Sequence, residues 1–495
     1  MDRGSGILMH ISSLPEAYGI GTLGKSAYQF ADFLKQSGQK YWQILPLGHT
    51  GYGDSPYQSF SAYAGNPYFI DLDTLKEEGL LDKADLEGLD REENGETVDY
   101  GRLFVTRYQV LRKAYARASV TLEDEIQAFS KKNKPWLDEY TLYMAVKEAM
   151  GNKSWLEWDE AIRLRQPQAV AHYKEQLKDE IGLWQFIQYK FYQQWNKLKK
   201  YVNTLGIQII GDLPIYVAVD SSDVWAHPEV FQLDENRVPH VVAGCPPDAF
   251  TELGQLWGNP IYDWEYLDKT GYSWWIDRMR ETSKLYDVVR IDHFRGFESY
   301  WAVPYGDENA KGGEWVKGPG MKLFRAIEQA LGKLNIIAED LGFMTDEVIS
   351  FRKETGYPGM KVLQFGFDTQ GTSDYIPHNC EKEAIMYTGT HDNSTIIGWL
   401  EEAGDQAQTA YAKKYLRLGT DETYHFGFIR GAWASNCILS LTQMQDVLGL
   451  DDEARMNTPG TLGGNWIWRM KKDALTNELS RHIYDMTKLY GRSLI

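Results

Sequence analysis

The chain has 495 residues, of which 43% are hydrophobic and 25% are charged. This composition is typical of a folded globular protein and excludes a disordered one. The net charge of −18 argues against proteins that need a basic surface to bind nucleic acid or an anionic membrane. The 17 Trp and 31 Tyr are more than a core ordinarily needs, and aromatic rings offer flat apolar faces for stacking. The composition therefore favours an uncharged ligand with apolar C–H faces.

The cysteines and the N-terminal residues indicate the cellular location to expect. Cys245, Cys380 and Cys437 are too few and too scattered for a disulfide framework or a CxxC metal site. The first ten residues lack the basic region and apolar run of a signal peptide. No segment approaches the roughly 20 apolar residues that span a bilayer. We expect reduced thiols, a cytoplasmic location and no membrane partner, and the pattern leaves the oligomeric state open.

Eight short apolar segments predict β-strands, with helical stretches between them. Near-continuous apolar runs such as 207–210 and 335–338 are typical of parallel strands that are buried on both faces. Eight such strands predict an α/β fold, a (β/α)8 TIM barrel, with a doubly wound open sheet as the alternative. The predicted strands are Ile7 to Ser12, Tyr41 to Leu47, Ile207 to Leu213, Asp287 to Asp292, Asn335 to Asp340, Lys361 to Phe367, Ala384 to His391 and Ile438 to Asp446.

Uneven spacing of these strands indicates insertions into one catalytic barrel that spans residues 1–495. Residues 75–200 predict a largely helical insertion between strands 2 and 3, because apolar residues recur there at three- and four-residue steps. Within it, Thr121 to Asp124 resembles a helix capping box. Residues 216–264 lack helical periodicity and predict a loop-rich insertion after strand 3 that covers the active site. No pattern predicts a C-terminal β-sandwich.

Acidic residues follow the predicted strands: Asp212 the third, Asp292 the fourth, Glu339 and Asp340 the fifth, and Asp392 the seventh. The carboxyl ends of barrel strands converge on one pocket, so these side chains should become neighbours. Retaining glycosidases need one carboxylate as nucleophile and a second, protonated one about 5–5.5 Å away. The pattern predicts such a pair, although a single strand-end acid more often caps a helix.

The surroundings of each acid suggest its role. Arg290 lies two positions before Asp292 on the same face of a strand, where its guanidinium could keep that carboxylate ionised. This favours Asp292 as nucleophile and Glu339 as acid/base, since clustered carboxylates help to keep one acid protonated. Asp392, beside His391, could bind sugar hydroxyls and stabilise the transition state.

Neither a metal nor an organic cofactor is expected. Histidines at strand ends lack the HxH or HExxH spacing of metal ligands. Residues 19–24 match GxGxxG, but the following strand lacks the acid that would hold a ribose. No GxSxG nucleophile motif is present.

Three motifs resemble those of the 4-alpha-glucanotransferases, also called amylomaltases or disproportionating enzymes, of glycoside hydrolase family 77 in the alpha-amylase clan. Further stretches that look like signatures of this family extend the resemblance over almost the whole chain. The three motifs are Arg290 to Gly296, Ala338 to Gly342 and Gly389 to Asn393, and the further stretches are 12–15, 51–57, 211–217, 244–248 and 459–466.

The resemblance implies an enzyme that moves α-1,4-glucan segments from a donor to the 4-hydroxyl of an acceptor glucan or glucose by a retaining double displacement. Its partners would be α-1,4-glucans and maltooligosaccharides. It implies Asp292 as nucleophile, Glu339 as acid/base and Asp392 as transition-state stabiliser, with Tyr52 in a secondary glucan groove. It places the remaining substrate contacts at Ser55, Tyr57, Asp212, Asp248, Gln255, Trp257, Arg290, His293, His391 and Asn465.

Three rival functions remain open at this point. A retaining α-glucan hydrolase shares the fold and the carboxylates and differs only in what accepts the intermediate. A non-catalytic glucan-binding barrel would keep the aromatic residues but would not need all three carboxylates. A metal-dependent barrel hydrolase would be inhibited by a chelator.

Overall fold

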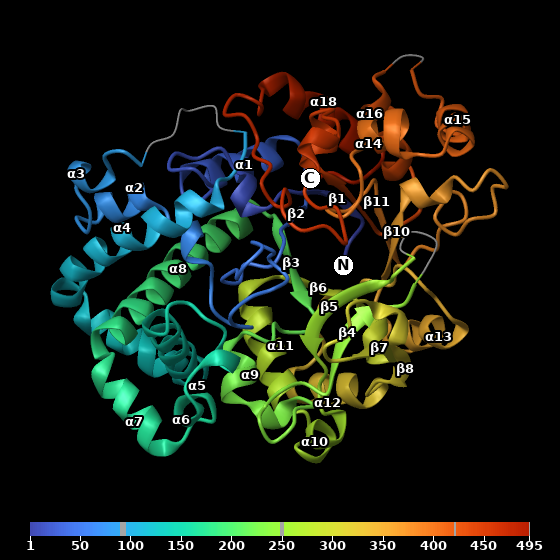
Figure 1. The fold of residues 1–495 in the computed structure, drawn as a ribbon. Coiled ribbons are helices and arrows are strands. Elements are labelled where there is room, and N and C mark those ends of the chain that lie inside the picture. The colour runs from blue at the N-terminus through green and yellow to red at the C-terminus, as the bar shows by residue number, and fades with distance from the viewer. Residues whose placement is uncertain (90–95, 248–251, 420–421, 495) are drawn as a thin grey trace.

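The computed structural model describes residues 1–89, 96–247, 252–419 and 422–494. Its centre is an eight-stranded parallel sheet in the order β10-β11-β12-β1-β2-β3-β6-β9 (Figure 1). The backbone N–H of Ala338 donates to Pro358 O over 3.0 Å, which joins the two ends of this order. The predicted (β/α)8 barrel is therefore confirmed. Its strands are β1 (Gly4–Leu8), β2 (Tyr41–Gln43), β3 (Gln208–Pro214), β6 (Val288–Asp292), β9 (Ile336–Ala338), β10 (Gly359–Val362), β11 (Ala384–Tyr387) and β12 (Leu439–Gln443).

Each predicted strand segment overlaps one barrel strand, and the apolar runs explain why. Alternate residues point to opposite faces of a strand, so both faces of a barrel strand must be apolar. In β6, Val288 lies in the cluster inside the barrel, whereas Val289 and Ile291 pack with the surrounding helices. The interior cluster consists of Tyr41, Ile210, Val288, Ile337, Met360, Val362, Ile385, Tyr387, Leu439 and Leu441.

Helices surround the barrel and bury its outer surface (Figure 1). The first and last of them, α1 and α18, pack against each other, so both ends of the chain contribute to the same layer. Short helices follow β11 and β12. The helices of this part are α1 (Lys25–Gln36), α11 (Ser273–Leu285), α12 (Met321–Leu331), α13 (Asp346–Thr355), α14 (Ile396–Gly398), α15 (Gln406–Tyr415), α16 (Tyr424–Trp433), α17 (Met444–Val447) and α18 (Asn477–Leu489).

In the described residues, seven α-helices separate β2 from β3, and they form the lobe on the left of Figure 1. The longest, α4, α5 and α8, pack on one another, and α8 also contacts β3. The predicted capping box at Thr121 is wrong: α4 continues to Thr121, whose hydroxyl donates to the carbonyl of Arg117 over 3.1 Å. The seven helices are α2 (Leu72–Glu77), α3 (Lys83–Leu86), α4 (Tyr100–Thr121), α5 (Glu123–Ala149), α6 (Glu160–Arg163), α7 (Pro167–Gln176) and α8 (Lys178–Thr204).

A second, antiparallel sheet lies beside the barrel in the order β5-β4-β7-β8. Two of its strands, β4 (Val241–Cys245) and β5 (Gln255–Pro260), fall within residues 216–264, together with α9 (Ser222–Ala226) and the start of α10 (Trp264–Lys269). The other two, β7 (Ser299–Pro304) and β8 (Glu314–Lys317), follow β6. This sheet brings the segment after β3 next to the segment after β6.

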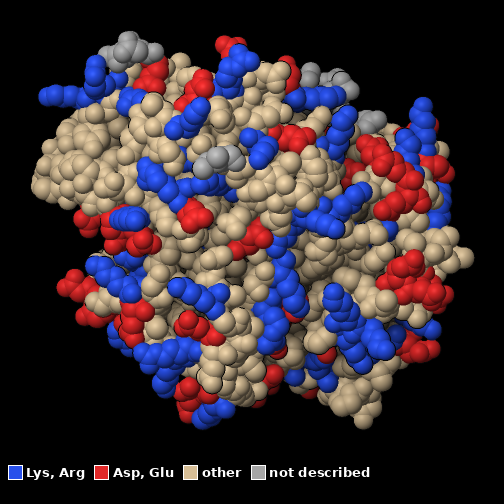
Figure 2. Space-filling view, turned by 180° about the vertical axis from the view of Figure 1, so that it is seen from behind, with Lys and Arg blue, Asp and Glu red and all other residues tan. Residues whose placement is uncertain are grey.

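The surface seen from behind carries charges of both signs, with Lys and Arg interspersed among Asp and Glu (Figure 2). None of the helices in the described part of the chain is long and apolar enough to cross a membrane.

Candidate active site

Arg290 joins two of the predicted carboxylates at the mouth of the barrel. Its Nη1 lies 2.6 Å from Oδ2 of Asp212 and 3.1 Å from Oδ1 of Asp292. The strand register produces this arrangement, because Asp212 of β3 pairs directly with Arg290 of β6. Val288, Arg290 and Asp292 share one face of β6, and Val288 points into the barrel. The polar site therefore lies directly above the apolar interior of the barrel, on the same face of β6.

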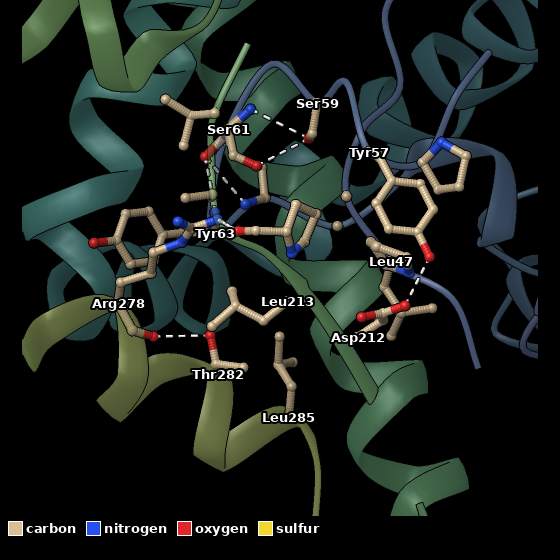
Figure 3. A pocket seen from close by; sticks show the side chains of 18 of the residues that line it. Leu47, Tyr57, Ser59, Ser61, Tyr63, Asp212, Leu213, Arg278, Thr282 and Leu285 are labelled. Atoms are coloured by element: carbon tan, nitrogen blue, oxygen red, sulfur yellow. Dashed lines mark hydrogen bonds between the residues drawn. The ribbon is translucent and has the colours of Figure 1, made fainter. Parts of the chain in front are cut away.

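Tyr57 completes the surroundings of Asp212. Its hydroxyl donates to Oδ2 of Asp212 over 2.7 Å, and Figure 3 shows the ring pointing toward that carboxylate. The side chain of Asp212 has no solvent exposure. Its second oxygen, Oδ1, has no hydrogen-bond partner among the described residues. Arg290 and Tyr57 together balance a buried charge that would otherwise be costly.

Glu339 follows β9 directly and is held by two backbone amides. The N–H of His293 donates to Oε2 and the N–H of Leu341 donates to Oε1, each over 2.7 Å. His293 adopts a left-handed backbone with φ 48°, which turns its amide toward the neighbouring loop. Both carboxylate oxygens are therefore fixed in space, and Glu339 is buried.

Burial is the main cause that raises the pKa of both Asp292 and Glu339. Arg290 opposes this effect on both groups, and for Asp292 the charges of Asp212 and Asp392 add to the rise. The cluster therefore retains a proton at a pH where isolated carboxyls would have lost it. A site with one ionised and one protonated carboxyl is what retaining glycoside chemistry requires.

Asp392 lies in the loop after β11 and is oriented from another part of the chain. Asn457 Nδ2 donates to its Oδ1 over 2.6 Å, and Arg455 Nη2 donates to its backbone oxygen over 2.6 Å. His391 Nε2 lies 3.4 Å from the same Oδ1. With 42% of its side chain exposed, Asp392 remains open to a ligand.

Asp446 fixes the two ends of the loop that carries Asp392. Its Oδ2 accepts from the hydroxyl of Thr388 over 2.8 Å, and its Oδ1 accepts from the N–H of Ile396 over 2.7 Å. Asp446 is fully buried, and burial raises its pKa to about 7. The loop from 388 to 396 is therefore tied to the segment after β12 at both ends.

Aromatic rings surround the carboxylates. Tyr57 stacks on His391 with ring centroids 5.2 Å apart, and Trp466 lies 5.9 Å from Tyr57. The ring of Trp257, on β5, meets His293 edge to face at 4.7 Å. These rings provide apolar faces on two sides of the polar cluster, as a sugar site needs.

The histidines of the site are neutral. Burial lowers the pKa of His293 to about 3 and is also the main cause that lowers the pKa of His391. A neutral imidazole can donate from one ring nitrogen and accept at the other. Both side chains thus suit the hydroxyls of an uncharged ligand.

The structure gathers nine of the predicted residues around the mouth of the barrel. Gln255 joins them through Trp257, whose Nε1 donates to Gln255 Oε1 over 3.1 Å. Ser55 lies near Tyr57, whose N–H donates to the Ser55 hydroxyl over 3.3 Å. The nine are Tyr57, Asp212, Trp257, Arg290, Asp292, His293, Glu339, His391 and Asp392.

Three other predicted residues are not part of this group. Tyr52 is fully exposed. The side chain of Asn465 bonds only within the turn at Thr458 and Thr461, so it supports the loop that carries Trp466. Asp248 lies outside the described residues.

Asp340, which also follows a predicted strand, turns away from the cluster. It pairs with Arg352 Nε at 3.0 Å and accepts from the N–H of Met360 over 2.7 Å. In the described ranges, no group of three or more His, Cys, Asp or Glu side chains is arranged to hold a metal ion.

Four residues of the site were missed by sequence reasoning as site residues: Arg455, Asn457, Trp466 and Asp446. Trp466 had a local signal, since it falls in one of the family-like stretches. Asn457 and Arg455 had none, because their partner is a loop more than 60 residues away along the chain.

The comparisons with known proteins agree over the whole chain. A family model described as 4-alpha-glucanotransferase, for glycoside hydrolase family 77, matches residues 9–476. The 4-alpha-glucanotransferase of Clostridium butyricum is 53% identical over 485 residues, covering 98% of this chain and 100% of that protein. That of Thermus thermophilus is 45% identical over 99% of both chains.

Among solved structures, the amylomaltase from Streptococcus agalactiae in complex with acarbose superposes with a TM-score of 0.95 at 45% identity, covering 99% of this chain and 100% of that one. The amylomaltase from Corynebacterium glutamicum, at 18% identity and a TM-score of 0.81, shares the fold over 99% of this chain and 75% of its own. The resemblance drawn from the motifs is thereby confirmed, and the chain belongs to glycoside hydrolase family 77, the family of the 4-alpha-glucanotransferases.

Proposed function

We propose that Asp292 is the nucleophile of this 4-alpha-glucanotransferase. Its side chain is 28% exposed at the mouth of the barrel, and Arg290 lies 3.1 Å from its Oδ1. An adjacent guanidinium favours the ionised carboxylate, which is the form that attacks an anomeric carbon. The bridging of Asp212 and Asp292 by Arg290 is the single observation that carries this assignment.

Glu339 is the general acid and base. It is buried, and burial raises its pKa against the opposing effect of the two backbone amides, whereas Arg290 makes its ion pair with Asp292; for this reason we assign the retained proton to Glu339. The two amides that bind its oxygens fix the direction in which it delivers the proton. Positioning of this kind is the usual requirement for general acid catalysis.

Asp392 stabilises the transition state through the sugar hydroxyls. Its carboxylate is held by Asn457 and open to solvent on its other side. Neutral His293 and His391 add donors and acceptors, and the Tyr57 ring provides the apolar face. Hydrogen bonds to the sugar that strengthen as the oxocarbenium-like state forms lower the barrier.

The reaction has two displacements. Asp292 bonds to the anomeric carbon of a donor α-1,4-glucan while Glu339 gives its proton to the departing 4-oxygen. Glu339 then takes the proton from the 4-hydroxyl of an acceptor glucan or glucose, whose oxygen displaces Asp292. The product keeps the α-linkage, and no cofactor takes part in either step. Maltooligosaccharides serve as both donor and acceptor.

The insertions support this site. The helical segment 75–200 forms the outer lobe, and the segment 216–264 covers the site with Trp257 and Gln255 on β5. A covered acceptor site orders the incoming sugar and favours it over water. Cys380 and Cys437 form no disulfide, which supports a cytoplasmic, reducing location.

The test is chromatography of the products that the purified protein forms from maltotriose, with Asp292→Asn as the control. A ladder of longer maltooligosaccharides plus glucose or maltose is expected from the wild type, and no products from the variant. Glucose and maltose without longer products would identify a hydrolase. A fully active Asp292→Asn variant would overturn the assignment of the nucleophile.

A further inference from the structure

An exposed aromatic pair lies beside the candidate active site and outside every residue assigned to it. Phe343, in the loop after β9, is 62% exposed, and Trp315, on β8, is 38% exposed. Their rings stack with centroids 6.3 Å apart and an angle of 22°. We infer that this pair, the 343/315 platform, is a binding site for the acceptor glucan chain beyond the catalytic carboxylates.

The platform is held rigidly from beneath. The guanidinium of Arg295 lies 3.9 Å from the centroid of the Trp315 ring, and Trp301 contacts the same ring edge to face at 5.2 Å. Arg295 is buried and donates to Ser299 Oγ over 2.9 Å and to the carbonyl of Phe343. Scattered exposed apolar side chains are ordinary, but two stacked and braced rings form a preorganised surface, which lowers the entropic cost of binding.

Backbone contacts make the platform continuous with the acid/base. The N–H of Phe294 donates to the carbonyl of Glu339 over 3.1 Å, and the N–H of Leu341 donates to Glu339 Oε1 over 2.7 Å. Arg295 then ties the same pair of loops together at Phe343. Phe343 is four residues beyond Glu339 on this loop, so the platform lies in the segment that directly follows the acid/base.

The role of Glu339 as acid/base indicates which part of the substrate binds the 343/315 platform. The acid/base faces the oxygen of the departing chain, and the acceptor later occupies the same place. A glucan that continues away from this oxygen on the Glu339 side meets the loop that carries Phe343. The outer face of the Phe343 ring is uncharged and apolar, which suits the C–H face of a glucosyl unit. This inference rests on the proposed function.

The test compares acceptors of different length in the full-length protein. Transfer from a fixed maltotriose donor to labelled glucose and to labelled maltopentaose is measured for wild type, Phe343→Ala, Trp315→Ala and Phe343→Tyr. Leu489→Ala, which removes a 73% exposed side chain at the end of α18, is the matched surface control. Thermal melting shows whether each variant is folded, and the fold should tolerate the loss of the exposed Phe343 ring.

We expect Phe343→Ala to raise the KM for maltopentaose by about three- to ten-fold, the value of one aromatic contact. The KM for glucose and kcat should stay unchanged, Phe343→Tyr should restore wild-type values, and Leu489→Ala should have no effect. Equal KM values for maltopentaose in wild type and Phe343→Ala, or equal changes of KM for glucose and maltopentaose, would overturn the assignment of the platform as an acceptor site. Failure of the proposed function would instead show as a wild type that transfers to neither acceptor.

Discussion

Asn457 donates a hydrogen bond of 2.6 Å to Oδ1 of Asp392. Asp392 lies just after β11, whereas Asn457 lies beyond α17, and Asn457 in turn donates its backbone N–H to the carbonyl of His391 over 3.1 Å. Together with the bond from Arg455 Nη2 to the backbone oxygen of Asp392, three hydrogen bonds connect the 455–457 segment to the 391–392 segment. The orientation of the third carboxylate depends on a residue that does not itself carry charge.

Replacing Asn457 by Ala should lower kcat by about ten- to a hundred-fold, because a small displacement of a group in the active site has effects of that size. Asn457→Asp should lower it further, since a second carboxylate 2.6 Å from Asp392 would repel it. Steady-state kinetics on maltotriose measures both. Asn335→Ala, at the other end of the barrel, is the control and should stay near wild type. Wild-type kcat in Asn457→Ala would refute the orienting role.

The hydrogen bond between Asn457 and Asp392 also shows which features of the site cannot be predicted from the sequence. The strands and the acids that follow them have local signals, because an apolar run that ends in Asp292 or Glu339 can be recognised without knowledge of any partner. The partners of Asp392 cannot be recognised in this way, since Asn457 reaches it only after the barrel has closed. Local reasoning also failed at Thr121, because Thr121 is the last residue of α4 and Leu122, without a side-chain cap, precedes the start of α5 at Glu123.

The second sheet was missed for a related reason. Strands β4 and β5 lie in a segment rich in Pro and Gly, and their pairing includes an irregularity between Val242 and Gly244. The other partner of β4, strand β7, comes after β6, more than 50 residues after β4. Strands with weak local patterns are stabilised by cross-strand contacts, so residues 216–264 could be predicted to be a structured excursion but not to be part of a sheet.

Tyr57→Phe should separate the two roles of the Tyr57 side chain, which are to stack on His391 and to donate a hydrogen bond to Asp212. The variant keeps the stacking on His391 but loses the 2.7 Å hydrogen bond to Asp212. A hydrogen bond to a charged group contributes about 1.5–3 kcal/mol, so we expect kcat to fall by about ten-fold or more with little change in KM. Tyr57→Ala also removes the ring and should raise KM as well. Identical kinetics in the two variants would contradict this division, and melting curves control for misfolding.

Trp257→Ala should shift the products toward hydrolysis. The indole lies 4.7 Å from the His293 ring and covers the site from β5, and its loss would leave the acceptor less ordered and water less excluded. The ratio of longer maltooligosaccharides to free glucose, measured by chromatography, should fall. Leu256→Ala is the control, because this neighbour on the same strand is 39% exposed. An unchanged ratio in Trp257→Ala would show that the indole does not select sugar over water.

Asp446 predicts a pH dependence of stability. Burial raises the pKa of Asp446 to about 7 in the folded protein, whereas an unfolded chain has an Asp pKa of about 3.9. Between these values the folded state binds more protons than the unfolded state, so the contribution of Asp446 to the free energy of unfolding falls as pH rises. It is fully present below about pH 4 and lost above about pH 7.

Asp446→Asn removes this titration while an amide oxygen and NH2 group can still bond Ile396 N–H and the Thr388 hydroxyl. The free energy of unfolding of the variant relative to wild type should therefore rise by about 2 kcal/mol between pH 5 and pH 7. Urea unfolding at pH 5, 6 and 7 measures it, and exposed Asp451→Asn should follow the wild type at each pH. A constant difference between Asp446→Asn and wild type would mean that Asp446 does not titrate in this range and that its hydrogen bonds alone hold the loop of Asp392.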